Sequence, residues 1–182
     1  EQVPREAFVP EAFRDRSYED ITLPIGHHQT LSQPAVVGLM TEALEIDDRK
    51  KVLEVGTGSG YQTAILSPLC RRVYTIERHA PLLEEAEKRF EELRIRNVTA
   101  KVGDGTLGWE AQAPFERIIV TAAATDVPPI LAEQLSLGGI MIVPIGLTED
   151  SQVILKVIKT EHGLETQELR DVRFVPLIPE EA

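Results

Sequence analysis

The chain has 182 residues, which suits a single α/β domain, and a formal net charge of −11, which would repel the phosphates of nucleic acid. Its apolar runs are only as long as strands, so we expect no membrane span. Its single cysteine, Cys70, excludes an internal disulfide, and we expect a cytoplasmic protein.

The first 49 residues have a pattern of their own. Polar residues and prolines interrupt residues 4–29 irregularly, and we expect this segment to cover a site instead of extending a sheet. Gln33–Leu44 carries apolar residues at helical spacing and predicts a helix. We therefore divide one domain, residues 1–182, into an N-terminal cap on the substrate side (1–49) and an α/β core (50–182).

From residue 50 onward, β-rich runs alternate with helical patterns. Such alternation predicts parallel strands joined by right-handed crossovers. The run Ile118-Ile119-Val120 is apolar on both faces, as a central parallel strand requires. The expected strands are Lys51–Val55, Arg72–Ile76, Val98–Val102, Arg117–Thr121 and Gly139–Pro144, and the expected helices lie near Gly60–Cys70, Pro81–Leu93 and Pro128–Leu135.

The end of the chain predicts an antiparallel hairpin. Gln152–Thr160 and Thr166–Pro176 are two β-rich runs on either side of His162-Gly163. The last part, Phe174–Leu177, has the pattern of an edge strand. The sequence therefore predicts a doubly wound, mostly parallel, Rossmann-like sheet with an antiparallel C-terminal hairpin.

Three alternating glycines, Gly56, Gly58 and Gly60, lie between an apolar strand and a helix. Glycine lets the backbone turn sharply and approach a ligand, and parallel sheets bind ligands at this edge. The G-x-G-x-G spacing differs from the G-x-G-x-x-G of dinucleotide sites. Glu54 adds a negative charge that suits a sulfonium cation and repels a pyrophosphate. We therefore expect S-adenosylmethionine as cofactor, with a βα turn that binds nothing as the alternative.

Two acidic residues follow the next strands. Glu77 ends the second core strand, 21 residues after Gly56, and an acidic residue there can accept both ribose hydroxyls. Asp104, in Gly103-Asp104-Gly105, could accept a hydrogen bond from the adenine amino group. Gly-Asp-Gly is also a turn signal, and the residues alone leave these two interpretations of Asp104 open.

Several segments together resemble the protein-L-isoaspartate O-methyltransferase family over nearly the whole chain. The motif around Ser32 is much more particular to this family than the glycine loop, which many methyltransferases share. The matching segments include Val3-Pro4-Arg5-Glu6, Leu23-Pro24-Ile25-Gly26, Gln29-Thr30-Leu31-Ser32-Gln33-Pro34, Val52 to Tyr61, Gly103-Asp104-Gly105, Thr121-Ala122-Ala123 and Phe174-Val175-Pro176-Leu177.

The resemblance implies a protein repair reaction. The enzyme would methylate the free α-carboxylate of L-isoaspartyl residues in damaged proteins and peptides, and the ester would close to a succinimide that hydrolyses partly to aspartate. The resemblance also implies site residues: Ser32 as catalytic, Ile25, Thr30 and Ser32 at the substrate, and Gly56, Thr57, Gly58, Ser59, Glu77, Asp104 and Gly105 at the cofactor. One departure is His28, where the family commonly has glycine.

The expected chemistry needs few catalytic groups. An α-carboxyl has a pKa of about 3.5, so the acceptor is ionised at neutral pH and needs no general base. The hydroxyls of Ser32 and Thr30 can orient it, although Ser32 could instead be a helix N-cap. His27 and His28 lack a third ligand at useful spacing, so we expect no metal. For Trp109 we favour core packing over a lid on the cofactor.

Other functions remain open at this stage. The enzyme could methylate another carboxylate acceptor, or the fold could be a non-catalytic module that binds the cofactor or a damaged protein. We expect isoaspartyl proteins and peptides as partners, no nucleic acid, no membrane and a monomeric state.

Overall fold

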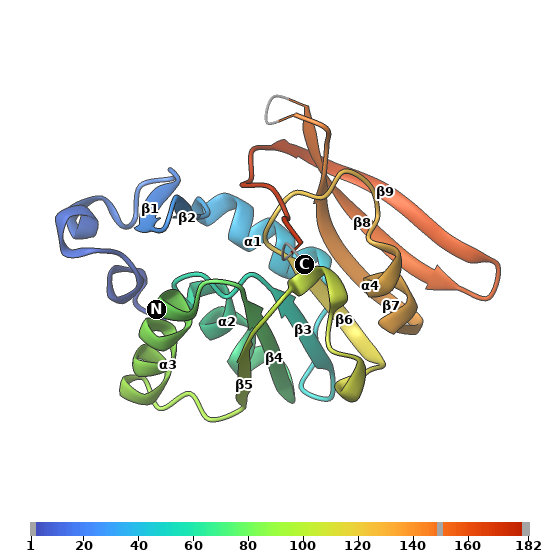
Figure 1. The fold of residues 1–182 in the computed structure, drawn as a ribbon, viewed down its shortest axis with the longest axis horizontal. Coiled ribbons are helices and arrows are strands. Elements are labelled where there is room, and N and C mark those ends of the chain that lie inside the picture. The colour runs from blue at the N-terminus through green and yellow to red at the C-terminus, as the bar shows by residue number, and fades with distance from the viewer. Residues whose placement is uncertain (1–2, 149–150, 180–182) are drawn as a thin grey trace.

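The computed structural model describes residues 3–148 and 151–179 and is built around a seven-stranded sheet (Figure 1). The strand order is β5-β4-β3-β6-β7-β8-β9. The pairs from β5 to β7 are parallel, and β8 and β9 are added antiparallel. The strands are β3 (Lys51–Val55), β4 (Arg72–Glu77), β5 (Val98–Val102), β6 (Phe115–Val120), β7 (Leu135–Ile145), β8 (Gln152–Thr160) and β9 (Gly163–Val172). This arrangement confirms the predicted fold class.

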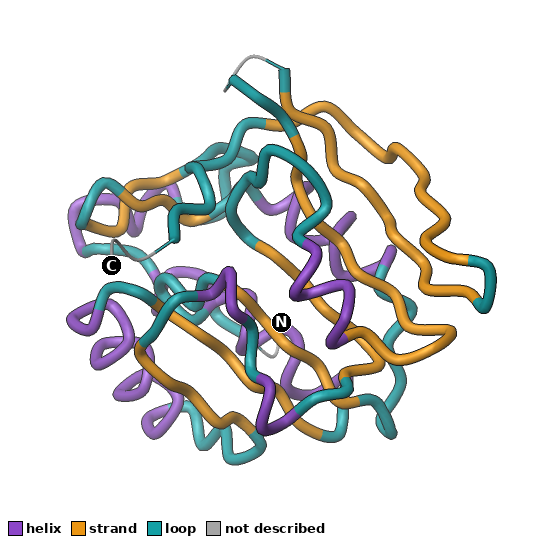
Figure 2. Tube along the Cα trace, turned by 45° about the vertical axis from the view of Figure 1, so that its right-hand side comes forward, coloured by secondary structure: helices purple, strands orange, loops and turns teal. Residues whose placement is uncertain are grey.

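The central strands are buried on both faces. Leu53 and Ile118 pack in one apolar cluster, while Val52 and Ile119 pack in the other. All four side chains have no exposed surface, because helices cover both faces of the sheet (Figure 2). The helices are α1 (Pro34–Ala43), α2 (Tyr61–Leu66), α3 (Ala80–Glu92) and α4 (Pro129–Gln134). The expectation that Ile118-Ile119-Val120 is a central strand is confirmed.

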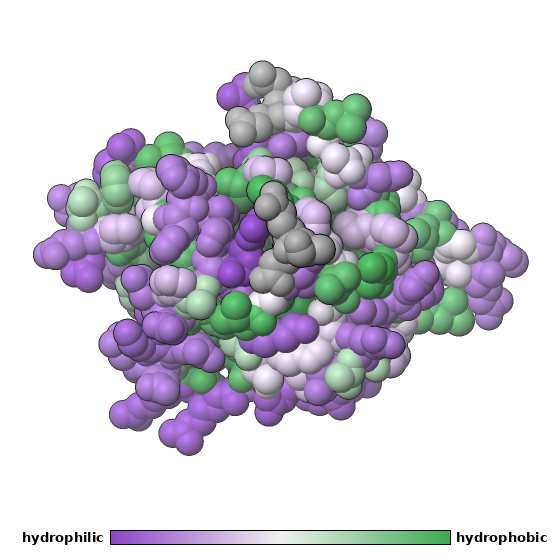
Figure 3. Space-filling view, in the orientation of Figure 1, coloured by the Kyte–Doolittle hydropathy of each residue, from purple (hydrophilic) through white to green (hydrophobic). Residues whose placement is uncertain are grey.

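Helix α3 packs closely on the glycine loop. Its apolar stripe, which includes Leu82, Ala86 and Phe90, is buried, and its outer face is hydrophilic (Figure 3). A Cβ at Gly60 would lie 2.7 Å from the Phe90 ring, and Gly60 has a φ of +87°. Glycine is therefore required here both for the turn and for the packing of α3.

The N-terminal segment forms its own small hairpin, β1 (Leu23–Gly26) with β2 (Gln29–Leu31), after two 3₁₀ turns at Arg5–Phe8 and Glu11–Arg16. It does not join the large sheet. The shorter 3₁₀ turns of the core are Ser67–Leu69, Gly105–Leu107 and Glu110–Gln112. A third apolar cluster holds the hairpin against α1 and α2, with Phe8, Leu23, Ile25, Val37 and Tyr61 among its members.

Arg5 connects this hairpin to the core. Its guanidinium is buried, donates to the carbonyl oxygens of Ser17 and Ser32 at 2.7 Å each, and lies 4.8 Å from the centre of the Tyr61 ring. Burial lowers the pKa of Arg5, but an arginine stays charged at neutral pH. One cation therefore holds the Ser32 segment beside the start of α2.

The start of α1 corrects the N-cap interpretation of Ser32. The N-cap is Gln33, without a side-chain hydrogen bond. The backbone N–H of Ala35 is instead bound by the Asp20 carboxylate at 2.8 Å, from 15 residues upstream. The Ser32 hydroxyl is thus not used for capping.

The end of the chain corrects a second expectation. Strand β9 ends at Val172, and Phe174–Leu177 does not extend the hairpin as an edge strand. This segment crosses back over the sheet and pairs with Ala123, whose N–H donates to Val175 O at 2.8 Å and whose carbonyl accepts from Leu177 N–H at 2.7 Å. The segment therefore lies beside the carboxyl end of β6.

None of the helices within the described residues is both long and apolar enough to cross a membrane.

The capping contact gives a stability test. We expect Asp20→Ala to lower the free energy of unfolding by about 1 kcal/mol, the usual value of a lost cap, and Asp20→Asn to restore most of it. Urea unfolding measures both. Ser32→Ala is the control and should unfold like the wild type; a loss from Ser32→Ala as large as that from Asp20→Ala would contradict this assignment of the cap.

Candidate functional site

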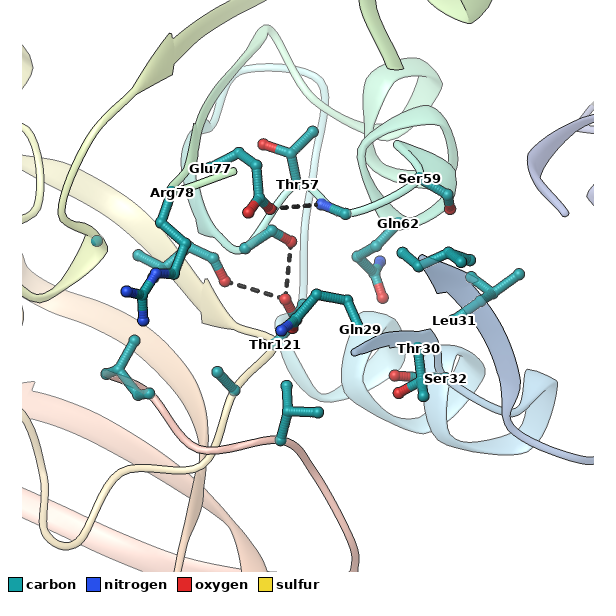
Figure 4. A pocket seen from close by; sticks show the side chains of 18 of the residues that line it. Gln29, Thr30, Leu31, Ser32, Thr57, Ser59, Gln62, Glu77, Arg78 and Thr121 are labelled. Carbon is teal, nitrogen blue, oxygen red and sulfur yellow. Dashed lines mark hydrogen bonds between the residues drawn. The ribbon is translucent and has the colours of Figure 1, made fainter. Parts of the chain in front are cut away.

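A cavity of about 370 Å³ lies at the carboxyl edge of the sheet, where the strand order reverses between β3 and β6. Open parallel sheets bind ligands at this point, and the volume is in the range of small-molecule sites. The hairpin, the glycine loop, the end of β4, the Thr121 loop and the C-terminal segment all contribute to its wall (Figure 4).

The cavity brings together most residues that the sequence singled out. Asp104 is the exception, because only its neighbour Gly105 lies in the wall. Asp104 accepts hydrogen bonds from the backbone N–H of Thr106 at 2.8 Å and from its hydroxyl at 2.6 Å, so its role toward an adenine stays a prediction. The predicted residues that line the cavity are Ile25, Thr30, Ser32, Gly56, Thr57, Gly58, Ser59, Glu77 and Gly105.

The glycine loop is held by the ends of the neighbouring strands. Gly56 has a φ of +94°, and a Cβ there would lie 2.3 Å from the Thr121 hydroxyl. That hydroxyl contacts the carbonyl oxygens of Gly56 at 2.7 Å and Val55 at 3.0 Å. Because no side chain fits at Gly56, the loop presents backbone to the cavity.

Glu77 fixes the same loop from the other side. One carboxylate oxygen accepts from the N–H of Gly58 at 2.8 Å, and the other accepts from the N–H of His79 at 3.0 Å. Each carboxylate oxygen can accept further bonds, and Glu77 lines the cavity. Its carboxylate can therefore hold the loop and still accept hydroxyl donors from a ligand.

Glu54 does not lie where the sequence suggested. It has no exposed surface and is not part of the cavity wall, so the argument from its charge to a sulfonium in the pocket is wrong. Burial raises the pKa of Glu54 to about 7, although hydrogen bonds from the hydroxyls of Thr63 and Thr75 oppose that shift. Since Thr75 donates its proton to Glu54, the Thr57 hydroxyl at 2.6 Å must donate to Thr75. Glu54 thereby sets the orientation of one hydroxyl in the cavity.

Two hydroxyls lie at the other end of the cavity. Figure 4 shows the oxygens of Thr30 and Ser32 on the same side of the cavity. Within the described part of the chain, neither side chain makes a hydrogen bond, whereas the Ser32 carbonyl is held by Arg5. The two hydroxyls are therefore available as donors to a ligand.

His27 and His28 adopt a left-handed backbone conformation in the turn of the β1–β2 hairpin. His27 and His28 have φ values of +50° and +57°, which non-glycine residues adopt at a cost of about 1–2 kcal/mol. His28 lines the cavity, and the His27 ring stacks on His79 with 5.4 Å between centroids. The chain therefore keeps the left-handed turn that glycine favours. Among the described residues, no three His, Cys, Asp or Glu side chains group as a metal site requires.

Trp109 is a packing residue. Its ring meets Tyr74 edge-on with centroids 5.5 Å apart, and the Lys101 ammonium lies 4.6 Å from its centre. It is not part of the cavity wall, so the packing role is confirmed. The wall also contains residues to which the sequence gave no role, among them Gln29, Gln62 and Arg78. Gln62 directly follows the matching segment Val52 to Tyr61, and this position was the only feature of the sequence that could have indicated a role for it.

The buried Glu54 predicts a pH effect on stability. Its pKa is raised in the folded state from 4.5 to about 7, so the folded state binds more protons between these values and stability falls as the pH rises through this window. Glu54→Gln lacks this titration. We expect the variant to gain roughly 1–3 kcal/mol relative to the wild type between pH 4.5 and 8.

Urea unfolding across that pH range measures the difference. Glu45→Gln is a control, because Lys156 holds the pKa of the exposed Glu45 carboxyl below its usual value of 4.5. Any stability that this ion pair adds is present at neutral pH and lost at acid pH, so this variant should change the slope of the pH profile only below about pH 4.5. Parallel pH profiles for Glu54→Gln and the wild type would contradict the raised pKa.

Known proteins resemble this chain in sequence and structure. The family model "Protein-L-isoaspartate(D-aspartate) O-methyltransferase" matches residues 1–182. The enzymes called protein-L-isoaspartate O-methyltransferase from Rhodospirillum centenum and Rhodospirillum rubrum are 57% and 58% identical, over 100% and 98% of this chain and 83% and 82% of their own lengths.

Two solved structures share the fold. A protein-L-isoaspartate O-methyltransferase superposes with a TM-score of 0.86 at 31% identity, over 96% of this chain and 58% of that longer one. A protein from Plasmodium falciparum, described as a putative member and in complex with S-adenosyl-L-homocysteine, gives 0.80 at 24% identity, over 98% and 88% of the two chains, and supports the fold alone. The whole-length match and the identities above 50% settle the classification: the chain belongs to the protein-L-isoaspartate(D-aspartate) O-methyltransferase family, whose members use S-adenosylmethionine.

Proposed function

We propose that this protein transfers a methyl group from S-adenosylmethionine to the α-carboxylate of L-isoaspartyl residues in damaged proteins and peptides. One observation carries the proposal. A single cavity joins a glycine loop braced by Glu77 to a pair of hydroxyls, Thr30 and Ser32, that have no other partner in the described part of the chain. The family membership supplies the reaction class.

The residues present fit S-adenosylmethionine. Glu77 offers the carboxylate oxygens that a ribose diol needs, and Gly56, where the Thr121 hydroxyl leaves no space for a Cβ, presents backbone to the cavity. Val55 and Ile76 add apolar wall for a purine ring. We assign Gly56, Thr57, Gly58, Ser59, Glu77 and Gly105 to the cofactor, and Asp104 to the adenine amino group. When bound, the cofactor supplies a methyl group activated by a sulfonium.

The chain's own residues then have to align and protect the reaction. The acceptor carboxylate is ionised at neutral pH, so no residue has to remove a proton. We assign Ser32 and Thr30 as donors that orient it, and Ile25 as an apolar contact beside them. The hairpin and the Phe174–Leu177 segment form part of the cavity wall, and their contact with a bound acceptor would limit water and strengthen these hydrogen bonds. Ser32 counts as catalytic in this sense of positioning the nucleophile.

The setting of the reaction is also part of the proposal. We propose a monomer that acts in the cytoplasm on isoaspartyl proteins and peptides. The net charge of −11 disfavours binding to nucleic acid or an anionic membrane.

A matched pair of peptides tests the reaction. With labelled S-adenosylmethionine, the wild type should label an isoaspartyl peptide and not the aspartyl peptide of the same sequence. Ser32→Ala should lower kcat/KM by about 10- to 100-fold, as expected when one donor to a charged group is lost, while the affinity for S-adenosylhomocysteine stays the same. Equal labelling of both peptides would refute the substrate, and labelling of a small carboxylate in preference to either would favour another acceptor.

A second experiment tests Glu77 at the ribose. By calorimetry, the wild type should bind S-adenosylhomocysteine about 10- to 100-fold more tightly than its 2′-deoxy analogue, because a hydrogen bond to a carboxylate is lost. Glu77→Ala should bind both compounds weakly and with similar affinity. If the variant only loosens the loop at Gly58, both affinities fall and their ratio is kept, which would contradict the assignment.

A further inference from the structure

Gln62 lines the cavity but is assigned neither to the cofactor nor to the acceptor carboxylate. It is the second residue of α2, only 8% of the residue's surface is exposed, and it lines the same cavity as Thr30 and Ser32. In Figure 4 its oxygen is directed away from Glu77, toward the side on which Thr30 and Ser32 lie.

The orientation of the Gln62 amide is fixed by a neighbouring helix. The Thr41 hydroxyl donates its one proton to the Val37 carbonyl at 2.7 Å, so toward Gln62 it can only accept. The Gln62 amide nitrogen donates to it at 3.0 Å. A flipped amide would place two acceptors against each other, so the oxygen must face the cavity.

That oxygen has no hydrogen-bond partner within the described residues. The buried side-chain atoms that lack a partner in the described part of the chain are Arg5 Nη1 and Glu54 Oε1, so the Gln62 oxygen can be reached from the cavity and is available to a donor on a ligand. The cavity therefore contains one fixed acceptor beside two free hydroxyl donors, and a ligand that supplies one N–H and one carboxylate would satisfy all three.

Resting on the proposed function, we infer that the Gln62 oxygen accepts the backbone N–H of the isoaspartyl residue. In an isoaspartyl residue this N–H and the accepting carboxylate are attached to the same carbon. In an ordinary aspartyl residue the carboxylate is one methylene further away. An acceptor held at a fixed place relative to Thr30 and Ser32 thus distinguishes the two linkages by the spacing between N–H and carboxylate.

A change of one atom in the substrate tests this contact. The probes are an acetylated isoaspartyl peptide and the corresponding β-linked malyl peptide, in which an ester oxygen replaces the N–H. For the wild type we expect kcat/KM to fall about 10-fold from the first to the second. Gln62→Met, similar in length and without the acceptor, should react about 10-fold more slowly with the isoaspartyl peptide and show almost no further loss with the malyl peptide.

Thr41 supplies the matched controls. Thr41→Val removes the hydroxyl that fixes the amide and should lower the discrimination between the two peptides, and Thr41→Ser should restore it. Melting temperature and the calorimetric affinity for S-adenosylhomocysteine check that each variant is folded, and both should stay near the wild-type values.

Two results would overturn the inference. In the first, Gln62→Met discriminates between the two peptides as strongly as the wild type. In the second, Gln62→Met lowers the affinity for S-adenosylhomocysteine at least 10-fold while the ratio of kcat/KM for the two peptides is unchanged, which would mean that the oxygen binds the cofactor's ammonium. A wild type that labels no isoaspartyl peptide refutes the proposed function itself, and this inference with it, so the two failures can be told apart.

Discussion

The site depends on the way the Glu77 carboxylate joins two strand ends. It receives the N–H of Gly58, from the loop after β3, and the N–H of His79, from the start of α3. A parallel sheet brings the carboxyl ends of β3 and β4 to one edge, but it does not fix the loops beyond them. The carboxylate does so, and the loop can then approach a ligand through backbone alone.

A second interaction holds the end of the cavity that carries Thr30 and Ser32 close to the glycine loop. The buried Arg5 guanidinium binds the Ser32 carbonyl and lies over the Tyr61 ring at the start of α2. The hairpin that carries Thr30 does not pair with the large sheet. Its position therefore rests on Arg5 and on an apolar cluster. Because Ser32 is held through its backbone and α1 is capped by Asp20, the Ser32 hydroxyl stays available.

Buried polar groups orient the cavity from behind. Glu54 accepts the proton of the Thr75 hydroxyl, so the Thr57 hydroxyl must donate to Thr75. Thr41 accepts from the amide nitrogen of Gln62 and so fixes the orientation of that amide. Neither Glu54 nor Thr41 lines the cavity. The sequence placed Glu54 correctly at the end of an apolar strand. It could not show that the side chain points into the core. A central strand is buried on both faces, so its sequence lacks the apolar–polar alternation that would mark a side facing solvent.

The sequence by itself determined the order of strands and helices in the core, the glycine loop and the family, but not the β1–β2 hairpin. Apolar periodicity and glycine spacing are local properties, so β3, β5 and β8 have the bounds that the pattern predicts. Tertiary structure decided what each polar side chain does. Asp20 caps a helix 15 residues away, Phe174–Leu177 crosses back to Ala123, and Gln62 is fixed by Thr41. These contacts join residues distant in the chain, and a hydrogen bond depends on distance and direction, neither of which a sequence pattern contains.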